Sequence, residues 1–418
     1  MASVEGLDIL EHSGDGYTRL VSGARWTVAA LNYAQRFDEK NIADLERHNQ
    51  TDEAFVLLSG AATLVMGEEA RCVRMEPLKI YNVRAGAWHN IFVSPDARVL
   101  VVENADTSKD NTDYLDLKTR RIFKRHPSFE EVMPGTYLLK VPFGPVWTGI
   151  ILVRGEKNFL IDSSHLEPER FLIPALGELG MKPSDIDWLL CTHVHGDHIG
   201  GHHALHEKYG VQVATLASCA DALRDPVKIA VRVRTRFPGK SPPPQSYLKG
   251  VEPDRLLEEG ELLEGRLRAI AAPGHDDDCL VWLDTLTGTA FTGDSLQANG
   301  TVCQGIAFYR DLAAYRATLD KLSKEKIENI VCGHDYDGIG SVVRGRDAVA
   351  AAIRYGAERV KVYGTRIAAY VNEGMPVEDE PVSLAERLIR DEGCGVPEML
   401  FLALHTVSEH IKELVNED

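Results

Sequence analysis

Several side chains that can bind a metal ion stand close together in one short segment of this sequence. The segment reads Thr192-His193-Val194-His195-Gly196-Asp197-His198. Imidazole and carboxylate groups suit zinc or iron at neutral pH. Alternate residues of an extended loop can point to one ion, and the two residues that follow can point to its neighbour. The spacing therefore predicts a loop that serves two metal ions.

Two metal ions need further ligands, and three later segments each offer one. In each of them an apolar, strand-like run precedes a glycine that stands beside the candidate ligand. The ligands are His275 in Pro273-Gly274-His275, Asp294 in Thr292-Gly293-Asp294-Ser295, and His334 in Cys332-Gly333-His334-Asp335. α/β folds place their sites at strand ends. The repeated design of strand, glycine and ligand therefore marks these residues as the remaining ligands.

Together these residues resemble the ligand set of the metallo-β-lactamase superfamily, in the form shared by hydroxyacylglutathione hydrolases and lactonases. The resemblance covers roughly residues 129 to 342, including the strand-like stretch Asn158–Asp162. It implies two divalent ions, zinc foremost, with iron or manganese as alternatives. One ion would lie on His193, His195 and His275, and a second on Asp197, His198 and His334, with Asp294 bridging them. Asp162 would not bind an ion itself but would orient one of the residues that do.

The resemblance implies hydrolysis of an ester, thioester or lactone in a small-molecule substrate. Two metal ions about 3.5–4 Å apart can share a water and lower its pKa towards roughly 7. The bridging hydroxide would attack the carbonyl, and Asp197 would act as the catalytic residue that orients it and passes its proton to the leaving group. No Gly-x-Ser-x-Gly segment occurs, so a serine nucleophile is not indicated.

Three other functions use parts of the same pattern. A phosphodiesterase or other phosphoester hydrolase would use the same two ions. A mononuclear iron dioxygenase that oxidises a persulfide sulfur would use one ion, and the presence of both Asp197 and His198 favours two. A binding or sensor protein with a relic site is opposed by the intact ligand set.

The residues after His275 depart from the family pattern, which often continues Thr-Pro-Gly-Ser. Here the sequence is Asp276-Asp277-Asp278-Cys279. These acids would add negative charge near the metals and argue against acidic substrates, unless they mark an exposed helix N-terminus. Other candidate substrate contacts have a plainer reading as solvated or packed residues. They are Arg232, Arg234, Arg236, Tyr309 and Tyr336.

The elements that must position these residues read as an α/β fold from Phe129 onward, because strand-like runs alternate with helical ones. Strands are expected at Thr136–Val141, Trp147–Arg154, Asn158–Ile161, Trp188–Cys191, Val213–Leu216, Arg268–Ala271, Leu280–Asp284 and Thr289–Phe291, and a helix at Glu167–Leu179. The family resemblance implies an αββα sandwich over residues 126–343. Residues 344–418 read as a helical extension, which in relatives often caps the pocket.

Residues 25–104 have a different pattern, with short strands split by turns, which predicts an all-β barrel or sandwich. Strands are expected at Ala54–Leu58, Ala61–Met66, Leu78–Val83, Ile91–Val93 and Arg98–Val102. The polar stretch Ala105–Arg125 reads as a linker, which gives a first domain of residues 1–125.

Two segments of this first domain resemble the motifs of cupins, which are small double-sheet β-barrels. They are Glu46–Gly60 and Val83–His89. The resemblance implies a pocket with His48, Glu53 and His89, and Glu46 stands where a further histidine would be. A metal site, a metal-free ligand pocket and a dimerisation module are the alternatives, and the last is consistent with a homodimer.

Composition limits the class of protein. The net charge of −17 over 418 residues disfavours long nucleic acids as partners. The seven cysteines are scattered and form no CxxC pair, which is typical of a reducing compartment. No apolar run is long enough to span a membrane, and the N-terminus lacks the features of an export signal. A cytoplasmic enzyme is therefore expected.

Overall fold

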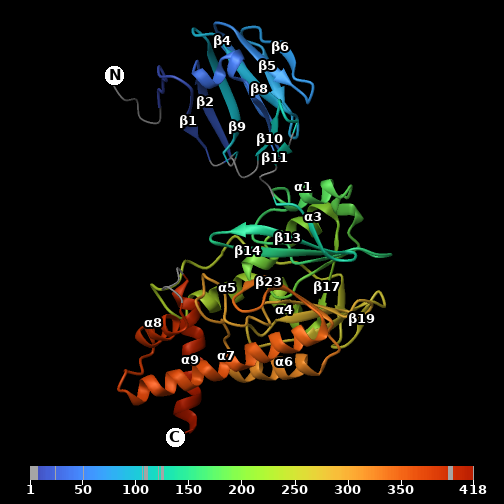
Figure 1. Cartoon of the computed structure of the whole chain (residues 1–418), viewed down its shortest axis with the longest axis vertical. Helices are drawn as coiled ribbons and strands as arrows, with labels where there is room; N and C mark the ends of the chain where they lie inside the picture. Colours follow the sequence, from blue (N-terminus) through green and yellow to red (C-terminus); the bar gives the residue numbers. More distant parts are fainter. Residues whose placement is uncertain are drawn as a thin grey trace. The chain divides into compact units, whose positions relative to one another are not determined.

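The computed structural model describes residues 8–23, 25–49, 51–105, 107, 112–120, 122–123, 127–393 and 399–417. The chain divides into two compact units, Met1–Pro127 and Ser128–Asp418, and each is described by itself (Figure 1). The expected domain boundary at residues 125/126 lies outside the described residues. None of the described helices is both long enough and apolar enough to cross a membrane.

The N-terminal unit consists of two antiparallel sheets. The first has the strand order β1 (Tyr17–Ser22), β2 (Trp26–Asn32), β9 (Arg98–Asn104), β4 (Glu53–Ser59) and β7 (Ile80–Val83). The second has the order β11 (Ile122–Phe123), β10 (Thr112–Asp116), β3 (Asp44–His48), β8 (His89–Val93), β5 (Ala62–Met66) and β6 (Arg71–Arg74). The strands predicted between residues 54 and 102 are thus confirmed.

Alternation along the strands of this unit builds the core between the two sheets. Phe55 and Leu57 from the first sheet pack with Leu64 and Ile91 from the second, and all four are buried. The sequence prediction of an all-β unit is therefore confirmed. The described strands form two separate sheets, so closure into a cupin-like barrel stays a prediction.

The predicted linker Ala105–Arg125 is wrong over its central part. Residues Thr112–Asp116 form β10, which pairs with β3 from Thr112↔His48 to Asp116↔Asp44. This strand looks like a loop in the sequence because its inward residues are polar. Asp113 is fully buried, and its carboxylate accepts two hydrogen bonds from the Arg47 guanidinium at 2.7 and 2.9 Å. The linker residues 106, 108–111, 121, 124 and 125 lie outside the described residues.

The C-terminal unit has two sheets between layers of helices (Figure 1). The first sheet has the order β12 (Glu130–Met133), β13 (Thr136–Phe143), β14 (Val146–Val153), β15 (Phe159–Ile161), β16 (Trp188–Leu190), β17 (Gln212–Leu216) and β18 (Arg255–Leu257). The second has the order β19 (Leu262–Leu263), β20 (Leu267–Ala271), β21 (Leu280–Asp284), β22 (Thr289–Gly293), β23 (Asn329–Tyr336) and β24 (Gly340–Arg344). The predicted α/β class and the predicted strands are confirmed.

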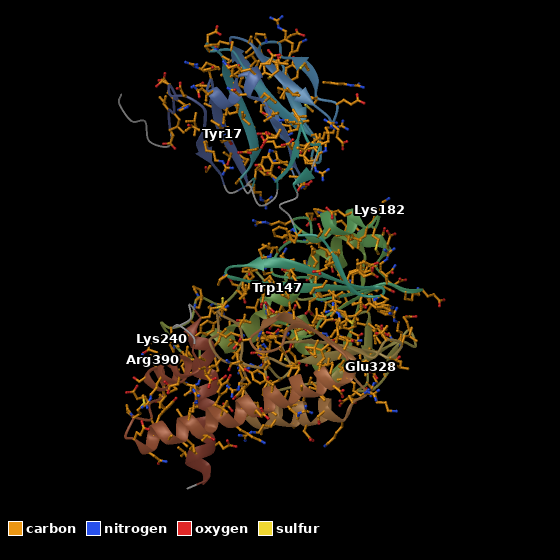
Figure 2. All side chains as sticks on the ribbon, in the orientation of Figure 1. Tyr17, Trp147, Lys182, Lys240, Glu328 and Arg390 are labelled. Atoms are coloured by element: carbon orange, nitrogen blue, oxygen red, sulfur yellow. The ribbon has the colours of Figure 1, made fainter. Side chains whose placement is uncertain are left out.

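Buried side chains join these layers, and Figure 2 shows how densely side chains fill the unit. Ile151 and Leu190 of the first sheet pack with Trp282 and Val331 of the second. The outer face of the first sheet is covered by α1 (Leu172–Glu178) and α3 (His202–Tyr209), and that of the second by α6 (Leu312–Lys324) and α7 (Arg346–Asn372). The remaining helices are α2 (Gly196–Ile199), α4 (Ala220–Arg224), α5 (Pro226–Arg234), α8 (Val382–Asp391) and α9 (Leu400–Glu417).

The helix predicted at Glu167–Leu179 begins later than expected. Residues 168–171 form turns, and α1 starts at Leu172. Pro174 accounts for this start, because proline is tolerated only in the first turn of a helix, where its missing N–H costs nothing. The helical prediction for the end of the chain is confirmed by α7, α8 and α9, with residues 394–398 and 418 outside the described part.

Candidate metal centre

The histidine segment forms the connection from β16 to the short helix α2. His193 and His195 lie in the loop, and Asp197 and His198 lie in the helix. Two buried carboxylates hold the loop. The backbone N–H of Thr192 donates to Asp162 at 2.7 Å, and that of Val194 donates to Asp278 at 2.7 Å. The loop conformation is therefore fixed by groups that lie outside the segment itself.

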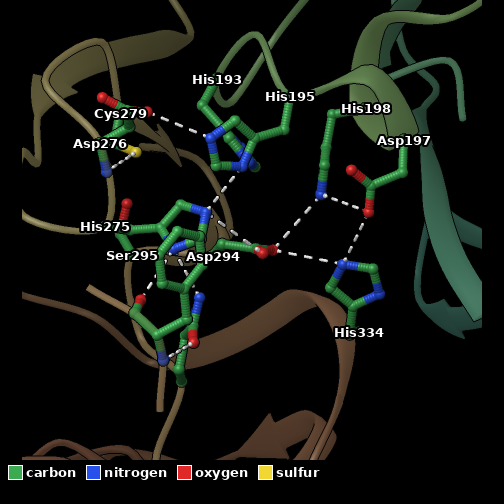
Figure 3. A network of polar contacts seen from close by, with 12 residues as sticks. His193, His195, Asp197, His198, His275, Asp276, Cys279, Asp294, Ser295 and His334 are labelled. Carbon is green, nitrogen blue, oxygen red and sulfur yellow. Dashed lines mark hydrogen bonds and ion pairs between the residues drawn. The ribbon is translucent and has the colours of Figure 1, made fainter. Parts of the chain in front are cut away.

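The structure brings the seven predicted ligands together from four separate segments of the chain (Figure 3). Within each of three overlapping groups, the candidate ligand atoms lie within 4.8 Å of one another. The groups are His193/His195/His275, His193/His198/Asp294 and Asp197/His198/His334. These seven residues are candidate ligands, and we refer to them together as the metal centre.

Asp294 lies between the two halves of the metal centre. Its Oδ2 is 3.6 Å from Nε2 of His275, whereas its Oδ1 is 3.4 Å from Nε2 of His198. The same Oδ1 is 3.6 Å from Nε2 of His334. Each carboxylate oxygen thus faces a different group of histidines, which is the arrangement that a bridging ligand requires.

The buried polar atoms of this centre fit a cation. Nε2 of His193, Nε2 of His198 and Oδ1 of Asp294 are buried and have no hydrogen-bond partner among the described residues. Such an unpaired atom costs about 1–3 kcal/mol when nothing else binds it. The donor set of imidazole nitrogens and carboxylate oxygens is one that divalent ions such as zinc accept.

The opposite nitrogens of the histidine rings are held by the protein. Nδ1 of His198 donates to Asp162 at 2.8 Å, Nδ1 of His275 lies 2.9 Å from the Phe308 carbonyl oxygen, and Nδ1 of His334 lies 2.6 Å from that of Trp147 on β14. These contacts turn each Nε2 toward the centre. Partners of this kind fix the tautomer and raise the affinity of a metal ligand.

The electrostatic setting keeps two of the histidines neutral. Burial, with His198 and His195 nearby, lowers the pKa of His193 well below its ordinary value. Burial also lowers the pKa of His275 to about 4. Burial opposes ionisation of Asp294, but the neighbouring His334 and His198 outweigh it and the pKa of this carboxyl is lowered. His193 and His275 are thus neutral and can accept a cation, whereas for His198 burial is outweighed by Asp294 and Asp197, which raise its pKa to about 10.

Asp276 orients a ligand, a role that the sequence analysis missed. It is buried, and its Oδ2 lies 3.1 Å from Nε2 of His195. Its Oδ1 accepts hydrogen bonds from Arg310, at 2.7 Å, and from Arg232. The position directly after His275 was the signal, but the sequence does not tell which histidine the carboxylate contacts.

One of the two readings of the acidic triplet Asp276-Asp277-Asp278 is wrong. It is not an exposed helix N-terminus, since Asp276 and Asp278 are buried and no helix starts there. The triplet does place negative charge next to the metal centre, since Asp276 contacts His195. Arg232 pairs with Asp276 and Asp277, and Arg310 pairs with Asp276, so the charge of these two residues is offset, whereas Asp278 forms no ion pair with a described residue.

A cavity opens onto the metal centre and is lined by Asp197, His195 and His334 together with apolar side chains such as Phe143, Phe308 and Leu402. Arg234, at the end of α5, also lines it. Its guanidinium carbon lies 4.8 Å from the Phe401 ring centroid, and it forms no ion pair with a described carboxylate. Of the three arginines considered from the sequence, Arg234 is thus the one that faces the cavity unpaired.

The two tyrosines considered as substrate contacts are packed residues. Both are buried, and neither lines the cavity. The Tyr309 hydroxyl lies 2.6 Å from Nε2 of His410 on α9. The residues of the predicted N-terminal pocket, His48, Glu53 and His89, lie together in the other unit.

Residues 141–334 match a family model described as the metallo-beta-lactamase superfamily. This segment contains Asp162 and every residue of the metal centre. Residues 141–334 belong to the metallo-β-lactamase superfamily. The resemblance inferred from the histidine and aspartate spacing is thereby confirmed, and the two-sheet unit is its fold.

Curated relatives match parts of this metallo-β-lactamase unit. "Uncharacterized protein YobT" of Bacillus subtilis is 32% identical over 150 residues, which are 34% of this chain and 59% of that protein. A "Hydroxyacylglutathione hydrolase" of Cereibacter sphaeroides is 30% identical over 167 residues, which are 39% of this chain and 54% of that protein. The chain thus spans little more than half the length of these two relatives. A protein of the same name from Chelativorans sp. is 26% identical, over 57% of this chain and 79% of its own.

Two solved structures share the fold of the metallo-β-lactamase unit. A beta-lactamase domain protein from Burkholderia ambifaria superposes with a TM-score of 0.53 at 19% identity, over 69% of this chain and 88% of that chain. A metallo-beta-lactamase family protein from Thermus thermophilus has a TM-score of 0.52 at 21% identity, over 68% of this chain and 95% of that chain. Identities this low support the fold alone.

Proposed function

We propose that the chain is a metal-dependent hydrolase that uses two divalent ions, zinc foremost, to open an ester, thioester or lactone bond in a small molecule. The observation that carries the proposal is Asp294, whose two carboxylate oxygens face different groups of histidines at 3.4–3.6 Å. The relatives named as hydroxyacylglutathione hydrolases support a thioester as the first substrate to try.

The metal centre would hold both ions. His193, His195 and His275 would bind one, Asp197, His198 and His334 the other, and Asp294 would bridge them. Two such ions supply a water of lowered pKa and polarise a carbonyl oxygen. Two ions are favoured over one because the second group of candidate ligands is complete and Nε2 of His334 lies 3.6 Å from Oδ1 of Asp294.

Asp197 would handle the proton. Its carboxylate lines the cavity, and its Oδ2 lies 3.3 Å from Nε2 of His334. Burial alone would raise the pKa of Asp197, but the surrounding His198 and His334 lower it by more. The pKa therefore lies well below its ordinary value, and the group is a carboxylate at neutral pH. It can accept the proton of the attacking water and deliver it to the leaving group. Phe143, Phe308 and Leu402 would exclude bulk water from this step.

Elemental analysis of the purified chain, combined with a panel of esters, thioesters and lactones, tests the proposal. We expect about two divalent ions per chain and turnover of at least one of these substrate classes. His195→Ala should lose both the bound ions and the turnover. His206→Ala is the matched control, because His206 lies on α3 with Nδ1 3.1 Å from the Val211 carbonyl oxygen, away from the metal centre. A single iron per chain with oxygen uptake on a persulfide would contradict the proposal, and so would turnover of phosphodiesters alone.

A further inference from the structure

Gln297 contacts the candidate ligand His275 (labelled in Figure 3) at Nδ1, the ring nitrogen that faces away from the metal centre. The Gln297 side chain is fully buried, and its Nε2 lies 2.7 Å from this Nδ1. The same Nδ1 lies 2.9 Å from the Phe308 carbonyl oxygen. One ring nitrogen therefore has two partners, an amide group and a carbonyl oxygen.

The orientation of the Gln297 amide is fixed by its other contacts. Its Oε1 accepts from the backbone N–H of Phe308 at 2.7 Å, so the NH2 group is the end that faces His275. The Gln297 backbone is held as well, since its N–H donates to the Tyr315 hydroxyl at 3.1 Å and its carbonyl oxygen accepts from the Gly300 N–H at 2.6 Å. Turning the amide over would set its NH2 group against another donor, the N–H of Phe308.

The two partners of His275 demand opposite hydrogen positions. An amide NH2 group only donates, so it needs a lone pair on Nδ1, whereas a carbonyl oxygen only accepts and needs a hydrogen there. A neutral imidazole carries its hydrogen on one nitrogen at a time. Gln297 therefore favours the tautomer with the hydrogen on Nε2, and the Phe308 carbonyl favours the tautomer with the hydrogen on Nδ1. Only the second tautomer leaves the lone pair of Nε2 free for an ion.

We infer that Gln297 is a positioning residue that restrains metal binding by His275, because its amide stabilises the tautomer that cannot bind an ion through Nε2. The inference rests on the metal centre of the proposed function and deepens it. When His275 joins His193 and His195 around an ion, its ring loses the hydrogen of Nε2 to water, gains one at Nδ1 and stays neutral. The new hydrogen then faces the NH2 group of Gln297, which lowers the affinity for the ion.

Histidine tautomers in the metal-free chain test this inference without any measurement of activity. Long-range proton–nitrogen correlation spectra of the full chain, with isotopically labelled histidine and with metal removed by a chelator, distinguish the two tautomers. His275→Asn identifies the signals of His275. We expect the hydrogen on Nε2 in the unsubstituted chain and on Nδ1 in Gln297→Met, which lacks the amide. A hydrogen already on Nδ1 in the unsubstituted chain would overturn the inference.

Zinc affinity gives a second readout. The full chain would carry His334→Ala and His89→Ala, which remove a ligand of the other group and a residue of the predicted N-terminal pocket, and zinc would be titrated against a chromophoric chelator. We expect Gln297→Met to tighten zinc binding about fivefold, the effect of one competing hydrogen bond. The urea midpoint should fall in this variant, because the Phe308 N–H loses its acceptor. Gln297→Glu, whose carboxylate can accept from both the Phe308 N–H and Nδ1 of His275, should tighten zinc binding at least about tenfold.

A purely supporting role of Gln297 predicts the opposite sign. If this side chain only supports His275, Gln297→Met would weaken zinc binding together with stability, and that result would contradict the inference. Gln212→Met, at an exposed position of β17, is the matched control and should change neither the tautomer nor the affinity. A chain that binds no zinc with Gln297 in place would instead contradict the proposed function, and the tautomers of the metal-free chain would still decide the role of Gln297.

Discussion

Asp162 forms hydrogen bonds both with Thr192, at the start of the histidine loop, and with the candidate ligand His198. One carboxylate oxygen accepts from the Thr192 N–H at 2.7 Å, and the other accepts from the Thr192 hydroxyl and from Nδ1 of His198, both at 2.8 Å. Asp162 itself has a φ of 61°, in the left-handed region that only a few non-glycine residues adopt. The strained backbone thus lies at the residue that aims a ligand.

Replacing Asp162 by asparagine tests this coupling. The amide keeps the size of the side chain, but one of its two acceptor positions becomes a donor that faces the donors of Thr192 and His198. We expect the affinity for the more weakly held ion to fall about 10–100-fold while the unit stays folded. Competition with a chromophoric chelator measures it. Asp320→Asn, which changes an exposed carboxylate paired with Lys324, is the control, and equal affinities in both variants would contradict the role.

Arg234 is placed to select the charge of a substrate that binds in the cavity. An unpaired guanidinium on the cavity wall is placed to hold a carboxylate, and a hydrogen bond to a charged group contributes about 1.5–3 kcal/mol. We expect Arg234→Met to raise KM at least about tenfold for a carboxylate-bearing ester and to leave a neutral ester of the same size nearly unchanged. Arg236→Met serves as control, because Arg236 stacks on Phe237 with 4.8 Å to the ring centroid. A similar rise for both esters would argue against charge selection.

At the scale of elements, α9 braces the segment that positions His275. The Thr406 hydroxyl donates to the Ala307 carbonyl oxygen at 2.8 Å and accepts from the Tyr309 N–H at 3.1 Å. Phe308, between these two residues, gives its carbonyl oxygen to Nδ1 of His275. The last helix of the chain therefore holds the backbone behind a metal ligand.

The Thr406→Val substitution removes both hydrogen bonds and keeps the shape of the side chain. Because two buried backbone groups lose their partner, we expect the free energy of unfolding to fall by about 1–3 kcal/mol. We also expect weaker metal retention, since the backbone on both sides of the Phe308 carbonyl, which orients His275, loses its hydrogen bonds to Thr406. Urea unfolding and metal content under chelator check both effects. Thr365→Val on the exposed face of α7 is the control. A loss of stability without any loss of metal would show that the hydrogen bonds of Thr406 do not affect the metal centre.

The elements also differ in how well they could be predicted. Strands with apolar alternation and the ligands that follow them were readable, since both signals are local. The strand β10 was not, because its buried residues are polar and need partners such as Arg47, which lies far away in the sequence. The same holds for Asp276, whose charge is offset by Arg232 on α5 and by Arg310. Contacts between distant segments decide these cases, and one sequence without its fold does not contain them.

At the scale of the whole molecule, each unit has hydrophobic clusters of its own. The cluster around Phe55 and Leu57 is built from residues of the N-terminal unit, and the cluster around Ile151 and Trp282 is built from the other. We therefore expect residues 128–418 produced alone to fold, to bind the same number of ions at the metal centre and to keep the turnover of the full chain. Circular dichroism, elemental analysis and kinetics measure this, and a shortened chain that is folded but metal-free would contradict it.

The position of α9 has a consequence for the order of events in the cell. Ribosomes add residues from the N-terminus, so all seven ligands are synthesised before Thr406, and a nascent chain that ends before α9 lacks the brace on residues 307–309. His275 is then in place in sequence but not yet fixed in orientation. We therefore expect firm metal loading only after α9 has been synthesised. A chain that ends between His334 and Leu400 would carry every candidate ligand and hold its ions poorly.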